Sequence, residues 1–346
     1  MTDNVLLAVL ATAGLAATWA LTLGVRRYAL RANLIDHPND RSSHSVPTPR
    51  GGGVGFVAAF LMVSALLWQR GLIGAALFNA LVGGGTLVAV LGFVDDRRPL
   101  PARVRFIGHV LSAAWVLWWL GPLPKLPLLG VELPLGWLAA PLAAAYMVWS
   151  VNLFNFMDGI DGIAAVELIT VMAGGAIAWA LASSGTEWSA AVVLAACVAG
   201  FLLLNFPPAR IFMGDAGSGF LGLLIGALTL WCAREQPMLF WSWLILYGCF
   251  MVDATTTLIR RVRRGEVFHQ AHRSHAYQYA SRRHGSHKVV TLAVGLINLG
   301  WLLPWALAVA LGHIEGALAT VLAYAPLVGL AFRYKAGDRA AQAVGQ

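Results

Sequence analysis

The sequence predicts an all-α, polytopic integral membrane protein with about 11 transmembrane helices. Of its 346 residues, 59% are hydrophobic and 12% are charged, whereas soluble domains carry roughly 25% charged residues. The mean hydropathy is +0.71, and apolar runs recur along the whole chain. We therefore expect one membrane domain over residues 1–346 instead of two soluble domains.

About eleven apolar runs have the length of a helix that crosses the hydrocarbon core, roughly 17–25 residues. Helices are expected because lipid cannot satisfy free backbone groups, and because the runs lack the alternation of strands. The runs cover residues 5–24, 53–68, 72–94, 104–120, 135–151, 160–182, 188–206, 217–233, 239–259, 289–311 and 317–332. We do not expect the first run to be a cleaved signal peptide, since no basic residue precedes it and it ends at Arg26 and Arg27.

Basic residues predict the orientation. With these runs as spans, all 24 Lys and Arg residues except Arg70, Lys125 and Arg234 fall on one side. Cytoplasmic loops are rich in Lys and Arg, so the amino terminus is expected in the periplasm and the carboxyl terminus in the cytoplasm. The main cytoplasmic segments are then 25–52, 95–106, 152–162, 205–219 and 260–288.

The formal net charge of +8 belongs mostly to the cytoplasmic side. Topology alone explains such a charge, and attraction for anionic lipids or nucleotides is the alternative. Nucleic-acid binding is not expected, because the basic residues are scattered over membrane loops. The three cysteines lie in apolar runs without CxxC spacing, which indicates packing residues and neither disulfides nor a zinc site.

Carboxylates gather at the cytoplasmic ends of the predicted helices. They are Asp95, Asp96, Asp158, Asp161, Asp215 and Asp253. Ionisable groups at this depth are costly and usually mark a site, so we expect several of them to share a polar cleft. Magnesium suits such a cleft, because it binds through one or two carboxylates, several waters and substrate phosphates.

Two further motifs favour a phosphate-binding site. Asp215 lies in MGDAGSG, whose glycines allow close approach of the backbone to a phosphate at a helix N-terminus. The AHRSH segment at 271–275 supplies cations for the opposite side. Alone, each motif has an ordinary alternative: a helix cap for the adjacent aspartates, a turn for GDAGS, a helix-breaking loop for NLFNFMDGIDG and a topogenic loop for the basic segment. Their common position on one membrane face favours a site.

Five motifs in order give a family resemblance. They are DHPNDRSSHSVPTPRGGG at 36–53, FVDD at 93–96, NLFNFMDGIDG at 152–162, FMGDAGSG at 212–219 and AHRSH at 271–275. The chain resembles the polyprenyl-phosphate N-acetylhexosamine-1-phosphate transferases, the MraY and WecA superfamily of glycosyltransferase family 4. Within that superfamily it is most similar to the WbpL-like branch that initiates O-antigen synthesis.

The resemblance implies roles around a metal. Asp95 and Asp96 match an acidic pair tied to catalysis and to orienting or deprotonating the lipid phosphate. Asp215 matches the family's magnesium-coordinating aspartate, with Asp95 as the expected second ligand. Asn155 matches an asparagine close to the metal and the diphosphate, and Asn152, in the same motif, is expected to bind substrate.

The resemblance also implies residues for the nucleotide sugar. Asp161 matches a residue near the uracil, and Asp158 lies between the uracil and the metal; both are expected to be catalytic. His272, Arg273 and His275 match a His-rich loop that contacts the sugar diphosphate. Two departures concern substrate choice: the family's DDxxD pattern has Pro99 at its last position, and AHRSH lacks three consecutive histidines.

The implied reaction moves N-acetylhexosamine 1-phosphate from a UDP-sugar to undecaprenyl phosphate, with release of UMP. We expect Mg2+ as cofactor, with Mn2+ as the alternative, and an active site on the cytoplasmic face of a bacterial inner membrane. A homodimer is compatible with the sequence. Arg103 and Arg105 are candidates for the lipid head, with a topogenic role as the alternative, and Glu167 and Asp253 have no predicted role beyond structure.

Three rival functions stay open from the residues alone. A transporter or flippase would use the same basic cleft without chemistry, although no internal repeat supports one. A membrane scaffold would leave the carboxylates unexplained. A glycosyltransferase would release UDP in place of UMP.

Overall fold

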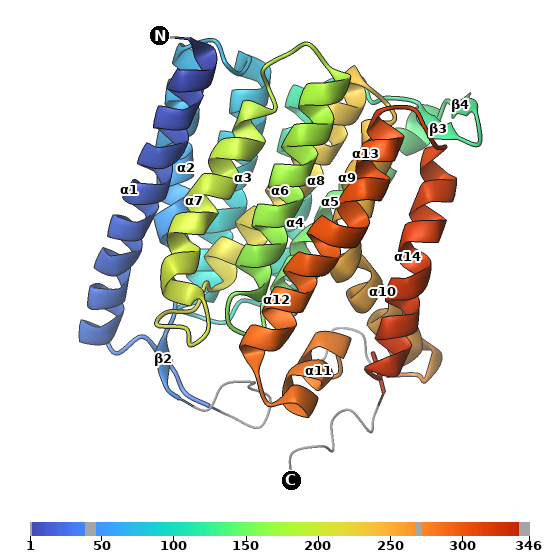
Figure 1. Ribbon diagram of the computed structural model, residues 1–346. Coiled ribbons are helices and arrows are strands. Elements are labelled where there is room, and N and C mark those ends of the chain that lie inside the picture. Colours follow the sequence, from blue (N-terminus) through green and yellow to red (C-terminus); the bar gives the residue numbers. More distant parts are fainter. Residues whose placement is uncertain (1, 39–45, 267–271, 339–346) are drawn as a thin grey trace.

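The computed structural model describes residues 2–38, 46–266 and 272–338. In these ranges the chain is a helical bundle with two small hairpins in its connections (Figure 1). Parts of the first motif (39–45), of the basic loop (267–271) and of the carboxyl tail (339–346) lie outside the described residues.

Apart from α11, the helices of the described residues follow the predicted apolar runs. The first group is α1 (Asp3–Arg31), α2 (Gly53–Gln69), α3 (Ala75–Asp95), α4 (Ala102–Leu120), α5 (Ala139–Met157), α6 (Ile163–Ala182) and α7 (Ser189–Asn205). The second is α8 (Asp215–Glu235), α9 (Leu239–Leu246), α10 (Gly248–Arg263), α11 (Ala276–His284), α12 (His287–Ile297), α13 (Leu303–Ala310) and α14 (Gly316–Arg333). A 3-10 turn, η1 (Gly136–Leu138), precedes α5, and a π-helical turn, η2 (Asn298–Leu302), joins α12 to α13.

The class of the fold is confirmed as an all-α polytopic membrane protein. Among the described residues, seven helices are long and apolar enough to cross a membrane, or up to eight if a bent pair forms one span. The count of eleven spans and the orientation stay predictions. Helices α2 and α7, which match two of the predicted runs, are apolar but shorter.

One predicted span is broken, and another contains a π-helical turn. The run 239–259 is broken between α9 and α10, where the chain bends by 72°. The run 289–311 contains the π-helical turn η2. The connections also hold two antiparallel hairpins that the apolar runs did not predict: β1 (Ile35–Asp36) with β2 (Thr48–Pro49), and β3 (Leu126–Leu128) with β4 (Val131–Leu133).

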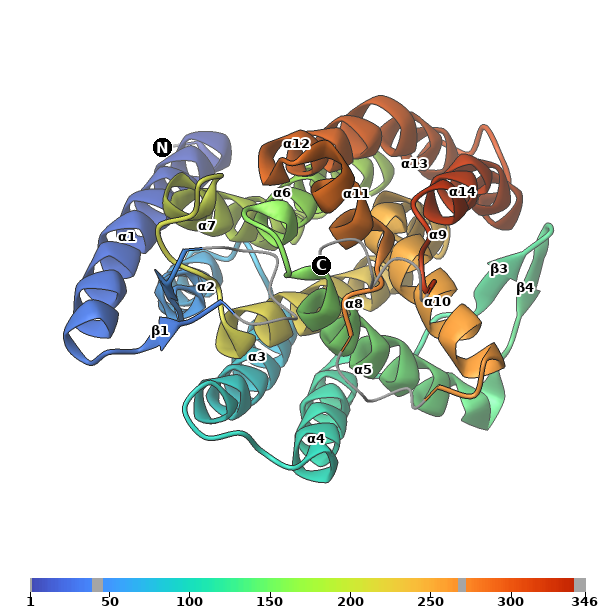
Figure 2. The same cartoon turned by 90° about the horizontal axis from the view of Figure 1, so that it is seen from below.

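Helix α8 lies near the middle of the bundle, with α1, α4 and α14 at the periphery (Figure 2). Every residue of α8 from Ala216 to Ala233 is buried. Glycines permit this close packing: a Cβ on Gly222 would lie 2.5 Å from the carbonyl oxygen of Ser150 in α5. A Cβ on Gly92 of α3 would lie 2.4 Å from the carbonyl oxygen of Asp215. Small residues thus bring α3 and α5 against the start of α8, as is typical of membrane helix pairs.

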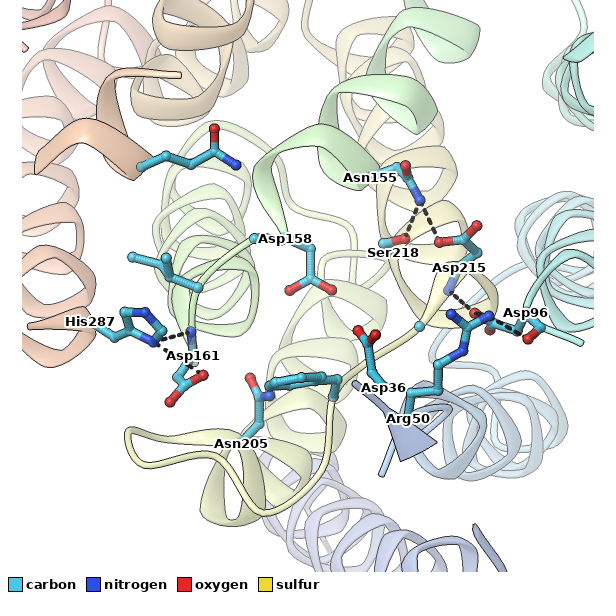
Figure 3. A pocket seen from close by; sticks show the side chains of 15 residues that line it. Asp36, Arg50, Asp96, Asn155, Asp158, Asp161, Asn205, Asp215, Ser218 and His287 are labelled. Atoms are coloured by element: carbon cyan, nitrogen blue, oxygen red, sulfur yellow. Dashed lines mark hydrogen bonds and ion pairs between the residues drawn. The ribbon is translucent and has the colours of Figure 1, made fainter. Parts of the chain in front are cut away.

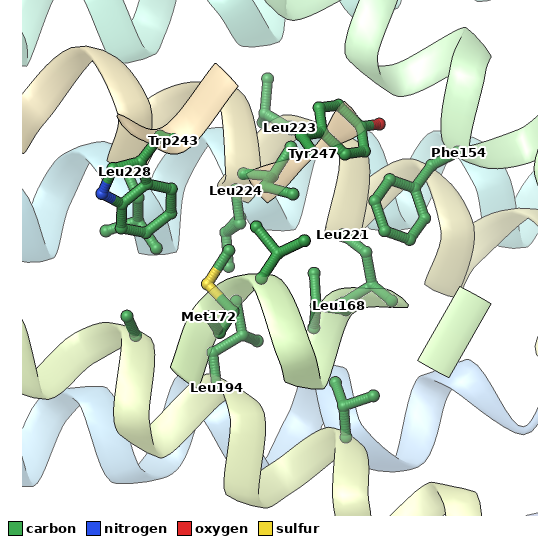
Figure 4. Packing of buried hydrophobic residues seen from close by; sticks show 14 of the residues in the cluster. Phe154, Leu168, Met172, Leu194, Leu221, Leu223, Leu224, Leu228, Trp243 and Tyr247 are labelled. Carbon is green, nitrogen blue, oxygen red and sulfur yellow. The ribbon is translucent and has the colours of Figure 1, made fainter. Parts of the chain in front are cut away.

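The apolar core fills the space among α5, α6, α8 and α9 (Figure 4). Phe154, Leu168, Leu221 and Trp243 are fully buried in it. Because lipid tails are as apolar as these side chains, the core stabilises the bundle mainly through close packing. This rigid core holds the motif-bearing ends of the helices in fixed relative positions.

Candidate active site

A cavity of about 240 Å³ lies at the end of the bundle where the predicted motif segments meet (Figure 3). Its walls come from segments far apart in the sequence. Its polar lining is Asp36, Arg50, Asp96, Asn155, Asp158, Asp161, Asn205, Asp215, Ser218, Gln278 and His287. The expected convergence of carboxylates from several helices is therefore confirmed for Asp96, Asp158, Asp161 and Asp215.

Asp96 caps the N-terminus of α8. Its Oδ1 accepts a hydrogen bond from the backbone N–H of Asp215 at 3.0 Å, and its Oδ2 accepts one from that of Ala216 at 3.2 Å. These are two of the N–H groups that a helix start leaves free, and a carboxylate there also complements the helix dipole. Gly214 has a φ of +80°, and a Cβ there would lie 2.7 Å from Asp96 Oδ2. The GDAG sequence thus lets α3 dock against α8.

Arg50 pairs with Asp96 across the cavity wall. The Arg50 Nη2 atom lies 3.3 Å from Asp96 Oδ1, and it also donates to the backbone carbonyl of Asp96. Burial raises the pKa of the Asp96 carboxyl above its ordinary value, while the two amide hydrogen bonds and the guanidinium act in the opposite direction. The pairing joins the first motif, on the strand and loop before α2, to the acidic motif.

Asp215 and Asp158 form the acidic middle of the cavity. Asn155 Nδ2 donates to Asp215 Oδ1 at 2.8 Å and to Ser218 Oγ at 3.3 Å. Burial, and then the charges of Asp215, Asp96 and Asp161, raise the pKa of Asp158 well above its ordinary value. Crowded carboxylates of this kind suit a bound cation, which removes the mutual repulsion.

Magnesium fits this donor set better than a metal with many protein ligands. Within the described ranges, no group of three or more His, Cys, Asp or Glu side chains could hold a metal ion by itself. Magnesium commonly takes one or two carboxylates and completes its shell with water and substrate phosphates. Asp215, oriented by Asn155, is the candidate ligand.

The opposite end of the cavity holds Asp161 (Figure 3). Its Oδ1 lies 3.2 Å from His287 Nδ1, and its Oδ2 accepts a hydrogen bond from the backbone N–H of Ala209 at 3.0 Å. The neighbouring N–H of Gly162 donates to Asn205 Oδ1 at 3.0 Å. Asp158 lies between this end and the Asp96–Asp215 end, so the cavity has two separate polar sites with a carboxylate between them.

An apolar groove of about 660 Å³ opens beside the cavity. We call it the α3–α5 groove, because α3, α4 and α5 form most of its wall. Its apolar lining includes Leu91, Phe106, Val110, Ala145, Val148, Trp149, Phe156 and Leu258. Asn155 and Asp215 line both the groove and the polar cavity, so the two spaces meet at these residues.

Asp95 faces the groove and not the polar cavity. Its Oδ2 lies 3.2 Å from Arg105 Nη1, and its Oδ1 accepts the backbone N–H of Leu100 at 2.6 Å. Asn152 also lines the groove, where its Nδ2 donates to the carbonyl of Val148 at 2.7 Å. Arg103 is exposed on α4 and lines neither space, so the structure brings Arg105 to the acidic pair instead.

The predicted His-rich segment lies behind the cavity wall. His275 is buried, and its Nδ1 lies 3.3 Å from Asp253 Oδ1, while His272 stacks on His275 with ring centroids 4.9 Å apart. Neither histidine nor Arg273 lines the cavity or the groove. Gln278, in the first turn of α11, reaches the cavity instead. The contact of this segment with a sugar diphosphate therefore stays a prediction.

Six residues of the cavity's polar lining were not among the predicted site residues. They are Asp36, Arg50, Asn205, Ser218, Gln278 and His287. The first two belong to the first motif and Ser218 belongs to GDAGS, so the motifs held a signal for them. Gln278 and His287 follow the last motif and carry no local pattern.

The candidate site thus combines an acidic cavity, where Asp96 caps α8, with an apolar groove that meets it at Asn155 and Asp215. A family model described as "Glycosyl transferase family 4" matches residues 78–233. The chain is 32% identical over 281 residues to the "Probable undecaprenyl-phosphate N-acetylglucosaminyl 1-phosphate transferase" of Bacillus subtilis, which covers 79% of this chain and 77% of that protein. The chain belongs to glycosyl transferase family 4, as the motifs predicted.

Two further relatives show the breadth of this similarity. The "Decaprenyl-phosphate N-acetylglucosaminephosphotransferase" of Mycolicibacterium smegmatis is 32% identical over 337 residues, covering 84% of this chain and 81% of that protein. The "Phospho-N-acetylmuramoyl-pentapeptide-transferase" of Moorella thermoacetica is 34% identical over 189 residues, covering 50% of this chain and 58% of that protein. The similarity to the N-acetylglucosamine enzymes therefore extends over more of the chain.

Proposed function

We propose that this chain transfers N-acetylglucosamine 1-phosphate from UDP-N-acetylglucosamine to a polyprenyl phosphate and so begins the synthesis of a cell-envelope polysaccharide. One observation carries the proposal: Asn155 and Asp215 line both the polar cavity and the α3–α5 groove. A nucleotide diphosphate in the cavity and a lipid phosphate in the groove would meet at these two residues. The names of the relatives support both substrates.

In the proposed reaction, an oxygen of the lipid phosphate attacks the β-phosphorus of the UDP-sugar. The bond from this phosphorus to the bridging oxygen breaks, and UMP leaves with that oxygen. Mg2+ held by Asp215, with Asp95 as the second candidate, would offset the charge on the phosphate oxygens. Asp95 borders the groove, where it would orient the lipid phosphate or accept its proton.

The same geometry suggests where the nucleotide lies. The uridine would occupy the end with Asp161 and His287, which is the end away from Asp96 and Asp215. A carboxylate such as Asp161 can accept a hydrogen bond from a nucleobase N–H. With the uracil at that end, the diphosphate would lie in the middle of the cavity, beside Asp158 and Asn155. Arg105, 3.2 Å from Asp95, is the cation nearest to a lipid head in the groove.

Finer points of the function also belong to the proposal. The names of the relatives support N-acetylglucosamine as the first sugar to test, with the 6-deoxy sugars N-acetylfucosamine and N-acetylquinovosamine as alternatives. Undecaprenyl phosphate is the proposed acceptor, and the product would initiate O-antigen or a related polysaccharide. The proposed location is the bacterial inner membrane, with the cavity at the cytoplasmic face.

Nucleotide release by the purified full-length chain in detergent tests the proposal. The reactions contain undecaprenyl phosphate, Mg2+ and a panel of UDP-N-acetylhexosamines, and UMP should form only when both lipid and metal are present. Asp215→Asn should abolish release, whereas Asp3→Asn, at the far end of α1, should leave it unchanged. Release of UDP would instead indicate a glycosyltransferase, and no nucleotide release from any sugar would favour a transporter.

A further inference from the structure

A second apolar groove lies on the other side of α3. We call it the α1–α3 groove; it has a volume of about 720 Å³. Its apolar wall includes Leu21, Gly24, Val25, Tyr28, Val54 and Phe93. Leu21, Tyr28 and Phe93 are all more than one-third exposed, so the groove is open along the outside of the bundle. Because α1 is long and apolar enough to cross a membrane, this opening faces lipid.

The rim of the groove is basic. Arg97 lies over the ring of Phe93, with its guanidinium carbon 4.1 Å from the ring centroid. On α1, Arg27 and Arg31 follow the groove residues Gly24 and Tyr28 by three positions, which places them on the adjoining strip of the helix. These arginines give the edge of the groove the charge that attracts an anionic lipid head.

The inner end of the groove holds two carboxylates, Asp36 and Asp96, together with Arg50. All three residues also line the polar cavity, so the two spaces meet there. The Asp96 carboxylate is turned toward the backbone N–H groups of α8 and toward Arg50. The basic rim therefore favours the anionic head group of a lipid, whereas the carboxylates at the inner end disfavour it there. The apolar wall between them suits only the lipid's hydrocarbon chain.

The reacting lipid has a better place elsewhere. Asp215 lines the α3–α5 groove but does not line the α1–α3 groove. A phosphate in the α1–α3 groove would meet Arg97 and then the Arg50–Asp96 pair before it reached Asp215. The second groove therefore suits a lipid that binds without reacting.

We propose that the α1–α3 groove is a binding site for an anionic glycerophospholipid. Its phosphate lies at Arg97, and one acyl chain runs along Leu21, Gly24 and Phe93. The site goes beyond the proposed transferase activity, because it needs neither the nucleotide sugar nor the acceptor.

Gly24 offers a direct test, because a Cβ built there meets no atom within 4 Å. The Cβ of Gly24→Leu therefore has room, and the rest of the leucine side chain narrows the groove; leucine also favours a helix more than glycine does. Gly329 in α14 is also free of contacts within 4 Å, so Gly329→Leu is the matched control. For the charge, Arg97→Gln is compared with Arg98→Gln, since Arg98 does not line the groove.

The measurement is native mass spectrometry of the full-length chain with dioleoyl phosphatidylglycerol or with dioleoyl phosphatidylcholine. We expect retained phosphatidylglycerol to fall about fivefold in Arg97→Gln. It should also fall in Gly24→Leu and stay at the wild-type level in both controls. Equal retention of the two phospholipids by the wild type, or unchanged retention by Gly24→Leu, would overturn the proposal. Displacement of phosphatidylglycerol by equimolar undecaprenyl phosphate would also overturn it, because the groove would then belong to the acceptor.

Discussion

Asp253, which had no predicted role, anchors the segment that carries the His-rich motif. The residue is only 7% exposed. Its Oδ1 accepts the backbone N–H of Ala276 and its Oδ2 that of Tyr277, both at 2.9 Å. From this anchored start of α11, the Tyr277 hydroxyl donates to the carbonyl of Phe156 at 2.9 Å, and Gln278 reaches the cavity. We therefore predict that Asp253 positions this wall of the site without touching substrate.

Asp253→Asn should loosen this wall. The amide keeps one acceptor oxygen but turns an NH2 group toward the other backbone N–H, which leaves a buried donor unsatisfied at a cost of about 1–3 kcal/mol. A loss of about 2 kcal/mol lowers the fraction of molecules with the start of α11 held at the cavity wall by at most about 30-fold. The KM for the UDP-sugar should therefore rise by no more than that factor. The KM for the lipid should change less, because α3, α4 and α5 form most of the wall of the α3–α5 groove and α10 contributes only Leu258 to it.

Hydrogen exchange and kinetics measure the two effects separately. Amide protection of residues 276–280 should fall in Asp253→Asn, and the KM for the UDP-sugar should rise in the UMP-release assay. Thr257→Val is the control, because it removes one hydrogen bond to Asp253 Oδ1 at 3.2 Å and leaves both amide bonds in place. Wild-type protection together with a wild-type KM in Asp253→Asn would refute the positioning role.

Three further predictions follow from the site. Asp95→Asn, like Asp215→Asn, should abolish UMP release while the protein purifies with a wild-type size-exclusion profile; a near wild-type rate would remove that residue from the mechanism. Mg2+ at 100 times its dissociation constant should stabilise the folded wild type by about 2.7 kcal/mol, measured as a rise in Tm, and an equal rise in Asp215→Asn would exclude Asp215 as a ligand. Ala145→Leu narrows the α3–α5 groove and should raise the KM for polyprenyl phosphate severalfold without changing that for the UDP-sugar; an unchanged lipid KM would place the acceptor elsewhere.

The sequence predicted the helices well, because apolar length alone determines where a chain can cross lipid. The break between α9 and α10 was not predictable in this way. No proline lies in the run 239–259, and Gly248 follows the bend at a place where a Cβ would lie 2.7 Å from the ring of Tyr324. The bend is thus associated with close packing against α14, which lies about 80 residues further along the chain. Local patterns do not contain such a contact.

The site shows the same division between local and distant signals. Asp96, Asn155, Asp158, Asp161 and Asp215 meet in one cavity as their motifs predicted. The partner of Asp161 is separated from it by 126 residues, and the partner of Asp96 by 46. Such pairs depend on how the helices pack, so the sequence indicated the acids but not their partners Arg50 and His287.

Adjacent aspartates at the end of α3 also illustrate what helix geometry decides. Successive residues of an α-helix point about 100° apart, so Asp95 and Asp96 project in different directions. Asp95 accordingly borders the α3–α5 groove beside Arg105, whereas Asp96 borders the polar cavity beside Arg50. The pair therefore divides between the polar cavity and the α3–α5 groove, each acid with its own arginine. In the proposed reaction, one DD motif would thus face the nucleotide with one acid and the lipid phosphate with the other, with Asp215 where the two spaces meet.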